Sequence, residues 1–530
     1  MKKILTVLLA ASMIALTVLM TACGSEPEQT TTASQTTGTT QATETTGSET
    51  SASGTSATGT SATSASTGES STTASSGSTQ VLTGKEKHPD FMDVNFGGRE
   101  FHFAVAVGRQ QDWDVYEIMA EATGNDNIIT EAIIDRNSVV ESLYNCKIKC
   151  TGTGFPENLV ANDMQLGTST YDFCMPMGRN AVANPSVYNL AALDMDLTHS
   201  WWNQDFIDTF GVTIDGTKRV YMTTGHFNLL AYDSTWALYF NKDVYDKVIA
   251  SGKSDIDIYA EVKNGTWTVD KMITLMDAAA TDVNGDQTLN WDDGDIFGCV
   301  TYANLYMIPA IWRGFGIDSL ATGEDGSLSP VSAANTDIAL LSSKVDKAIE
   351  LWGRSSMTAV TGTAALDALS NGQALFISEC LALTNRGADE NARYSIVPFP
   401  KYDEAQERYY QHVCDTVYGI QVSAATKDLN QAATFLEVFG YHSMMLLYPQ
   451  YVTFLKTQCF CEDEAGEMLE IVFQNRVFDL GYYAKYELAS RISTFISTEK
   501  NMLSKAIAGI SRADEQKLSD YYNAFRKLEH

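Results

Sequence analysis

The sequence predicts an α/β fold, because its apolar residues alternate between the period of a strand and the period of a helix. Residues 99–107, REFHFAVAV, put every second apolar side chain on one face, as a half-buried strand does. Residues 127–145 bring apolar side chains onto one stripe at the 3.6-residue period of a helix. The strand-like segments 146–150 and 170–177 follow. A strand, helix, strand order of this kind predicts parallel strands with helical crossovers.

The length of the globular part predicts two lobes. The composition becomes globular from about Lys85, and the residues from there to His530 are too many for one ordinary core. The most apolar later stretch, residues 443–455, contains Pro449, so we do not expect it to span a membrane. Further amphipathic helices are expected over residues 268–280, 427–443 and 482–496.

The N-terminus predicts export and anchoring. Lys2 and Lys3 precede an apolar run that ends in small residues before Cys23, which is the pattern of a secretory signal. The segment resembles a bacterial lipoprotein signal, and this implies a signal peptide over residues 1–22 and a lipidated Cys23. Residues 23–84 are dominated by Ser, Thr, Gly and Ala and cannot offset their ordering entropy, so we expect a disordered tether. The globular domain, residues 85–530, is then held at the extracellular face of the cell membrane through the lipid anchor only.

The charge of the chain excludes some partners. It has 36 Lys plus Arg against 66 Asp plus Glu, for a net charge of -30. Such an acidic chain is not expected to bind nucleic acid or an anionic membrane surface. Motifs for catalysis are also missing, because the sequence contains neither H-E-x-x-H nor G-x-S-x-G. We therefore expect a binding protein and not an enzyme.

One loop has the spacing of a calcium site. In DVNGDQTLNWDD, residues 282–293, the oxygen ligands would be Asp282, Asn284, Asp286, the Thr288 carbonyl and Asp293. Gln287 replaces the usual glycine at position six, which costs about 1 to 2 kcal/mol if the backbone there is left-handed. The loop resembles that of dockerin modules. We expect a structural Ca²⁺ ion here; the alternative is an Asx-rich turn that holds no ion.

Seven segments in order resemble one family, the lipid-anchored solute-binding proteins of bacterial ABC importers, in particular the sugar-binding group (family 1 type). The segments are STYDFCMPM, LDMDLTHSWWNQ, RVYMTTGHFNLLAYDSTWALYFNKDVYD, NGTWTVDKM, DVNGDQTLNWDDGDIFG, ALDALSNGQALFIS and YSIVPFPKYDEAQERYY. Together they cover nearly all of the chain from about Phe96 onward.

The resemblance implies a two-lobed, periplasmic-binding-protein-like fold of type II, in which the lobes close over a ligand like a Venus flytrap. Lobe one is expected over about 96–233 and 413–447, and lobe two over about 238–410 and 448–530. The chain segments that cross between lobes would absorb the closure motion. The family also implies ABC transporter permease subunits as partners, and we expect a monomer.

A sugar ligand asks for aromatic faces and planar polar groups, because a sugar ring offers a flat patch of C–H groups surrounded by hydroxyls. On the family pattern, the aromatic candidates on the cleft side are Trp201 or Trp202, Tyr302, Trp312 and Tyr418. The hydrogen-bonding candidates are Asp172, Arg179, Asp233, Glu379 and Arg386.

The adjacent pair Trp201 and Trp202 raises a problem of its own. Neighbouring side chains point in different directions on either a strand or a helix, so one core does not easily hold both. We expect one indole to pack lobe one and the other to face the cleft or its rim.

The sequence therefore predicts an extracellular solute-binding protein that captures a carbohydrate, an oligosaccharide, for an ABC permease. Two alternatives stay open. One is a surface-tethered glycan adhesin or scaffold without transport, which the long tether would suit. The other is a binding protein for a peptide or another polar solute.

Overall fold

The computed structural model describes residues 82–107, 118–120, 127–182, 184–303, 306–324, 326–361, 364–382, 393–460 and 462–528. The chain separates into two units, residues 1–81 and 82–530, and the described residues belong to the second unit. The predicted signal peptide, Cys23 and most of the predicted tether lie outside the described residues. Within the described part of the chain, no helix is both long enough and apolar enough to cross a membrane.

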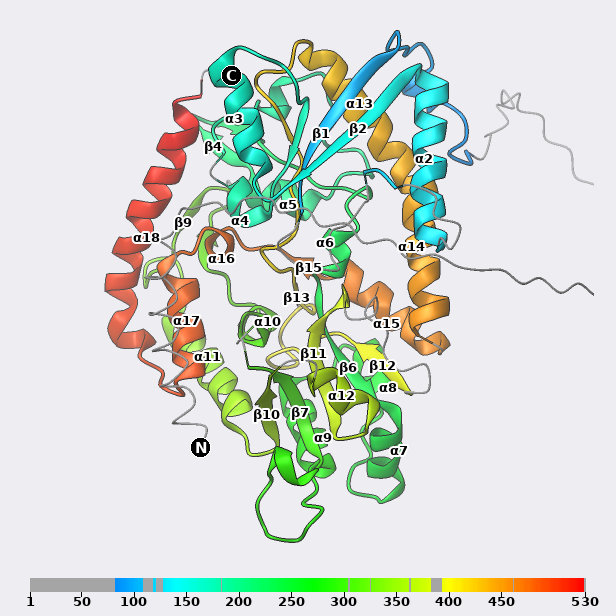
Figure 1. Ribbon diagram of the computed structural model, residues 1–530. Helices are drawn as coiled ribbons and strands as arrows, with labels where there is room; N and C mark the ends of the chain where they lie inside the picture. The colour runs from blue at the N-terminus through cyan, green and yellow to red at the C-terminus, as the bar shows by residue number, and fades with distance from the viewer. Residues whose placement is uncertain are drawn as a thin grey trace, which may run out of the picture. The chain divides into compact units, whose positions relative to one another are not determined.

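The first sheet is built as the sequence predicts. Strands β1 (Arg99–Ala106), β2 (Cys146–Thr153) and β3 (Phe173–Met175) are parallel, and the short β14 (Gln421–Val422) joins them antiparallel in the order β14-β3-β1-β2. Helix α2 (Ile128–Tyr144) makes the predicted crossover from β1 to β2. We call this sheet and the elements packed on it lobe one (Figure 1).

Aromatic side chains fill the core of lobe one. Phe101 and Phe103 of β1 project toward helix α13 (Leu429–His442), whose Phe435 ring centroid lies 4.0 Å from that of Phe101. Phe173 of β3 joins the same stack. Large side chains from two strands and one helix thus close the face of the sheet that α13 covers.

The second sheet, that of lobe two, has the order β10-β7-β11-β6-β12. Strands β7 (Phe297–Tyr302), β10 (Met357–Val360) and β11 (Ala374–Cys380) are parallel, whereas β6 (Trp236–Asn241) and β12 (Tyr394–Val397) run as an antiparallel pair at the edge. Every residue of β6 and β11 is buried, because helices cover both faces. The helix α9 (Val269–Ala279) realises the amphipathic segment predicted over 268–280.

Short segments connect the two sheets. The chain leaves lobe one after helix α6 (Leu230–Asp233), and Thr235 forms an antiparallel bridge with Val413, where the chain comes back. The amide of Cys414 donates to the carbonyl of Ser234 at 2.9 Å. A second connection is helical: α13 continues through the π-helical segment Ser443–Leu447 into α14 (Tyr448–Phe454).

The last helix, α18 (Leu503–Arg526), also serves both cores. Leu503 and Ile510 pack into the core of lobe two, whereas Phe525 packs with Val212 and Tyr221 of lobe one. Residues 503–526 were expected within lobe two, so this placement refines the predicted boundary. In Figure 1 this red helix and the gold α13–α14 rod run along opposite sides of the two sheets.

The helix predicted over 482–496 is broken in two. Helix α16 (Leu480–Tyr483) ends before Lys485, whose φ of 57° lies in the left-handed region. Helix α17 (Glu487–Ser497) starts anew, because the Asp514 carboxylate accepts hydrogen bonds from the amides of residues 487 and 488. The cap comes from a residue far along the chain, so local periodicity carried no sign of the break.

The remaining elements complete the two lobes. The 3-10 and π-helical segments are η1 (Pro89–Phe91), η3 (Leu190–Ala192), η4 (Trp291–Asp293), η6 (Ser443–Leu447) and η7 (Leu455–Cys459). The other helices are α3 (Pro156–Leu166), α4 (Gly178–Ala181), α5 (Gln204–Phe210), α7 (Lys242–Ala250), α8 (Ile258–Lys263), α10 (Met307–Gly314), α11 (Ile338–Gly353), α12 (Ala364–Ser370) and α15 (Asp463–Gln474). The other strands are β4 (Val212–Ile214), β5 (Thr217–Arg219), β8 (Leu320–Thr322), β9 (Leu328–Pro330), β13 (Gln411–His412) and β15 (Arg476–Val477).

Candidate functional site

The carboxyl ends of strands from both sheets meet the segments that cross between lobes. Beyond β3, the amide of Gly178 donates to the carbonyl of Val417 at 2.6 Å. Beyond β11, the amide of Leu381 donates to the carbonyl of Thr235 at 2.9 Å. Open α/β sheets bind ligands at the carboxyl ends of their strands, so this junction is where we place the candidate site.

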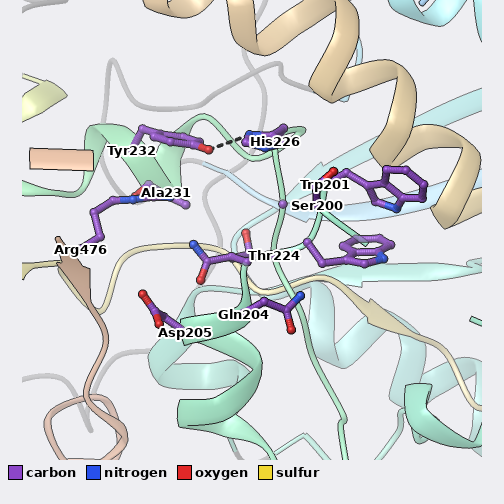
Figure 2. Close-up of a pocket in the computed structure, with 12 residues that line it drawn as sticks. Ser200, Trp201, Gln204, Asp205, Thr224, His226, Ala231, Tyr232 and Arg476 are labelled. Atoms are coloured by element: carbon purple, nitrogen blue, oxygen red, sulfur yellow. Dashed lines mark hydrogen bonds between the residues drawn. The ribbon is translucent and has the colours of Figure 1, made fainter. Parts of the chain in front are cut away.

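A pocket of about 220 Å³ opens beside the first crossing (Figure 2). Its walls come from the loop and first turn of α5, from a second lobe-one loop, from α6 and from β15. The lining residues are Ser200, Trp201, Trp202, Asn203, Gln204, Asp205, Thr224, Gly225, His226, Ala231, Tyr232 and Arg476. Aromatic and planar polar side chains thus share one cavity, the combination that a sugar ring requires.

The adjacent tryptophans share one carboxylate. The indole Nε1 of Trp201 donates to Oε2 of Glu437 at 2.7 Å, and the indole of Trp202 donates to the same oxygen at 3.3 Å. The His199 ring and the amide of Asp196 also contact this carboxylate, at 3.1 and 2.8 Å. Glu437 is only 2 % exposed, so a single buried side chain of α13 holds the whole loop from 196 to 202.

The two indoles therefore do not divide between core and cleft as the sequence predicted. Both are nearly buried in lobe one, at 3 % and 4 % exposure, and both also line the pocket. Two glycines permit this arrangement. A Cβ at Gly440 would lie 2.5 Å from the Trp201 ring, and a Cβ at Gly225 would lie 2.3 Å from the Trp201 carbonyl oxygen. The physical reason for the difference is Glu437, which attracts both N–H groups to one point.

Arg476 forms the wall opposite the indoles. Its guanidinium carbon lies 3.9 Å from the centroid of the Tyr232 ring, and its Nη1 donates to the carbonyl of Ala231 at 3.2 Å. The Tyr232 hydroxyl in turn contacts Nδ1 of His226 at 2.7 Å. Burial, together with the charge of Arg476, lowers the pKa of His226 to about 4, so His226 is neutral at pH 7.

A second polar cluster lies at the junction. Asp415, in the returning segment, is 4 % exposed and pairs with Arg179 at 3.3 Å and with Lys485 at 2.6 Å. The Lys485 ammonium lies 4.7 Å from the ring centroid of Tyr482, which is half-buried. The cluster joins side chains of lobe one, the crossing and the C-terminal elements.

Four of the predicted ligand-binding residues are buried or make hydrogen bonds and ion pairs within the protein. Trp312 is fully buried in α10 and donates from Nε1 to the hydroxyl of Ser493 at 3.2 Å. The Asp172 carboxylate, at the amino end of β3, pairs with Arg99 at 2.7 Å. Asp233 accepts from the Tyr451 hydroxyl at 2.6 Å. Tyr418 is 2 % exposed in the core of lobe one. These four were assigned from order along the chain, which does not determine direction or depth.

The remaining predictions fall at the junction or outside the described residues. Tyr302 ends β7 and Glu379 stands one residue before the end of β11, so both lie at the carboxyl ends of lobe-two strands. Arg179 follows β3 and belongs to the Asp415 cluster. Arg386 lies outside the described residues. Contact of any of these residues with a ligand stays a prediction.

The loop at residues 282–293 has the backbone that its spacing predicts. Gly285 and Gln287 have positive φ, 79° and 70°, and the Asp282 carboxylate accepts from both of their amides at 2.6 Å. Asn284 accepts from the amide of Asp286, Asp286 from that of Thr288, and Asp293 from the Asn290 side chain. The acidic side chains are engaged with the loop itself. Among the described residues, no three His, Cys, Asp or Glu side chains stand close enough to hold a metal.

Sequence reasoning missed the residues that organise the pocket. Glu437 had a signal that could have revealed it, because it lies between Leu436 and Val438 in a helix that is apolar on nearly every side. A carboxylate in such a position requires buried donors. Arg476 could have been found in the same way, because it is a charged residue in the short buried strand β15, next to Val477.

Solved structures with a similar fold are known. A sugar transporter from Rhizobium etli, in an open conformation, matches with a TM-score of 0.50 and 14% identity, over 78% of this chain and 99% of that chain. A cyclic alpha-maltosyl-1,6-maltose binding protein from Arthrobacter globiformis matches with a TM-score of 0.50 and 12% identity, over 80% of this chain and 100% of that chain. The chain has a two-lobed, periplasmic-binding-protein-like fold. This confirms the predicted fold class. No family model and no curated protein matches the chain.

Proposed function

We propose that the chain is an extracellular solute-binding protein that captures a carbohydrate, an oligosaccharide, and delivers it to an ABC import permease. The observation that carries the proposal is the pocket at the lobe junction, where two indoles, a tyrosine, an amide and a guanidinium share one cavity. Its position beside a crossing segment supports closure over a ligand. The similar structures include binding proteins for sugars, and the fold is shared with them.

The proposal includes a lipid-anchored, monomeric protein on the outer face of the membrane, and no chemical step. Its support is the signal-like N-terminus with Cys23, the Ser/Thr-rich residues 23–84 and the lack of any catalytic motif in the sequence. Affinity would come from ring stacking, from a few buried hydrogen bonds and from lobe closure. A micromolar dissociation constant needs about 8 kcal/mol.

A bound Ca²⁺ ion in loop 282–293 is part of the same proposal. The proposal is supported by the twelve-residue ligand spacing, by the positive φ at Gly285 and Gln287 and by the hydrogen bonds that their amides donate to Asp282. Asp282, Asn284, Asp286 and Asp293 would supply side-chain oxygens and Thr288 a carbonyl. The ion would tie the end of α9 to the start of β7 and would take no part in ligand capture.

The test is a thermal melting screen of the chain with oligosaccharides, amino acids and short peptides. A ligand at a hundredfold its dissociation constant adds about 2.7 kcal/mol to the free energy of unfolding, which is a readable shift. Asp205→Ala, in the pocket, should reduce the shift. Asp208→Ala, one turn further along α5 and outside the pocket, should leave it unchanged.

The outcomes separate the alternatives. A shift with one glycan series supports the proposal. A shift with peptides or amino acids only would assign the pocket to another polar solute. Retention on insoluble polysaccharide without a shift by any soluble ligand would instead favour the tethered adhesin.

A further inference from the structure

Arg476 is a buried cation without an anionic partner among the described residues. It is 8 % exposed, yet it takes part in none of the ion pairs in the described part of the chain. Arg313, which is also buried, pairs instead with Asp318 and Asp479. Buried arginines are ordinarily paired with an anion, so the position of Arg476 needs another explanation.

The contacts of Arg476 orient its charge without neutralising it. Nε donates to the carbonyl of Phe473 and Nη1 to the carbonyl of Ala231, both at 3.2 Å. One face of the guanidinium lies on the Tyr232 ring. Carbonyl oxygens and a ring face compensate part of the desolvation cost, but they carry no formal negative charge. The guanidinium is therefore held in one orientation, and no negatively charged side chain of the described residues neutralises its charge.

The pocket directs this charge toward a ligand. Arg476 lines the cavity, and His226 nearby is neutral at pH 7 because its pKa is lowered to about 4. Among the described residues that line the pocket, Asp205 is the only carboxylate; it is exposed and forms no ion pair with Arg476. Figure 2 shows Arg476 and Asp205 on the same side of the cavity, facing the indole side across it. An incoming anion would thus meet a fixed, planar donor group.

We propose that this pocket takes a carboxylate-bearing sugar unit, such as a uronic acid, with its carboxylate on Arg476. The inference rests on the proposed function and names the substrate class of that site. A guanidinium matches a carboxylate in planar, two-pronged geometry. Gln204, Thr224 and Asp205 then provide donors and acceptors for ring hydroxyls. With a net charge of -30, the chain repels a dense polyanion, so a ligand with few charges is expected.

The experiment is a calorimetric titration of the chain with two oligosaccharides of the same linkage and length, one of neutral hexose and one containing the matching uronic acid. The variants are Arg476→Gln and Arg476→Lys, and the control is Arg491→Gln, an exposed arginine on α17. Asp205→Asn removes the Asp205 carboxylate from the pocket. Free acetate and a sulfated oligosaccharide test whether any anion suffices. Melting curves of each variant report folding.

The wild-type chain should bind the uronic acid ligand about tenfold to hundredfold more tightly than the neutral one, as expected for charge-assisted hydrogen bonds. Arg476→Gln should abolish this preference, with a larger loss of affinity for the uronic acid ligand than for the neutral one, whereas Arg491→Gln should leave both affinities unchanged. Arg476→Lys should retain part of the preference, and Asp205→Asn should increase it.

Several results would overturn the inference. Equal affinity for the two sugars would remove it, and so would an equal loss for both in Arg476→Gln, since the arginine would then be structural. A sulfated ligand that binds as tightly as the uronate would reject the preference for a carboxylate. Binding of free acetate as tightly as the uronate would reject the need for a sugar ring. If neutral sugars bind and acidic ones do not, only this inference fails. If no carbohydrate binds at all, the proposed function fails with it.

Discussion

The sheet of lobe one runs in the order β14-β3-β1-β2, and four strands of lobe two repeat it as β6-β11-β7-β10, with the antiparallel strand at the same place. The tryptophans on these two frameworks are nevertheless held differently. In lobe one, Trp201 and Trp202 donate to a carboxylate. In lobe two, Trp312 donates to a hydroxyl and Trp267 to the carbonyl of Pro398.

The kind of acceptor distinguishes tryptophans that only pack a core from tryptophans that also line the pocket. Neutral acceptors suffice where an indole only fills a core, as in lobe two. A buried carboxylate is expensive to desolvate, and it is retained in lobe one where four donors of one loop converge on it beside the pocket. The shared strand order thus sets the frame, whereas a single buried charge shapes the wall of the candidate site.

Replacing the acceptor in each lobe is the strongest way to break this comparison. In Glu437→Gln the carbonyl oxygen can replace only one carboxylate oxygen, so the N–H₂ group faces either the indole donors or the Asp196 amide, and we expect the free energy of unfolding to fall by about 3 kcal/mol. Ser493→Ala, which removes the acceptor of Trp312, should cost about 1 kcal/mol. Denaturant unfolding curves measure both. Equal losses in the two variants would contradict the special role of the carboxylate.

Acid should destabilise the packing around the end of α13 in lobe one. His442, fully buried at the end of α13, contacts the Gly84 carbonyl and the Tyr144 hydroxyl, and burial lowers its pKa to about 4. The unfolded chain therefore binds the proton more readily, and stability is lost as the pH falls from about 6.5 toward 4. Between pH 7.5 and pH 5 this amounts to about 2 kcal/mol.

The matched variant for this effect is His442→Gln, which cannot titrate in that range. Its unfolding free energy should fall less between pH 7.5 and pH 5 than that of the wild type. Parallel pH curves for the two proteins would show that His442 does not contribute.

Calcium should act on lobe two alone. At a hundredfold its dissociation constant, the ion should add about 2.7 kcal/mol, and a chelator should remove that gain. Asp286→Ala should abolish the response in thermal melting, whereas Asp270→Ala, an exposed aspartate on α9, should preserve it. Ligand affinity should stay the same with and without chelator. A calcium response that survives in Asp286→Ala would place the ion elsewhere.

The smallest expected effect concerns position six of the same loop. Gln287 has a φ of 70°, which glycine adopts without strain. Gln287→Gly should therefore stabilise the chain by about 1 kcal/mol and strengthen calcium binding. The same substitution at Gln204, which lines the pocket and has no positive φ, should not stabilise. A loss of stability in Gln287→Gly would contradict the strain argument.

The fold could be predicted largely from the sequence because its signals are local. Alternating Phe101 and Phe103 determine which face of β1 is buried, and helix α2 follows from its own period. The break at Lys485 could not be predicted, because it depends on a cap from Asp514. The candidate site was predicted less well. Trp312, Tyr418 and Trp201 are all aromatic and all buried, and only the place of each side chain in the folded chain, beside the pocket or away from it, separates them. Glu437 and Arg476 act through partners more than 200 residues away.

The most direct test of the whole account is small-angle X-ray scattering of the chain, titrated with the oligosaccharide that gives the largest thermal shift. A binding protein that closes its lobes over one ligand should show a smaller radius of gyration at saturation, with one ligand bound per chain in parallel calorimetry. Binding without any decrease in the radius, or with many ligands along one chain, would contradict the account.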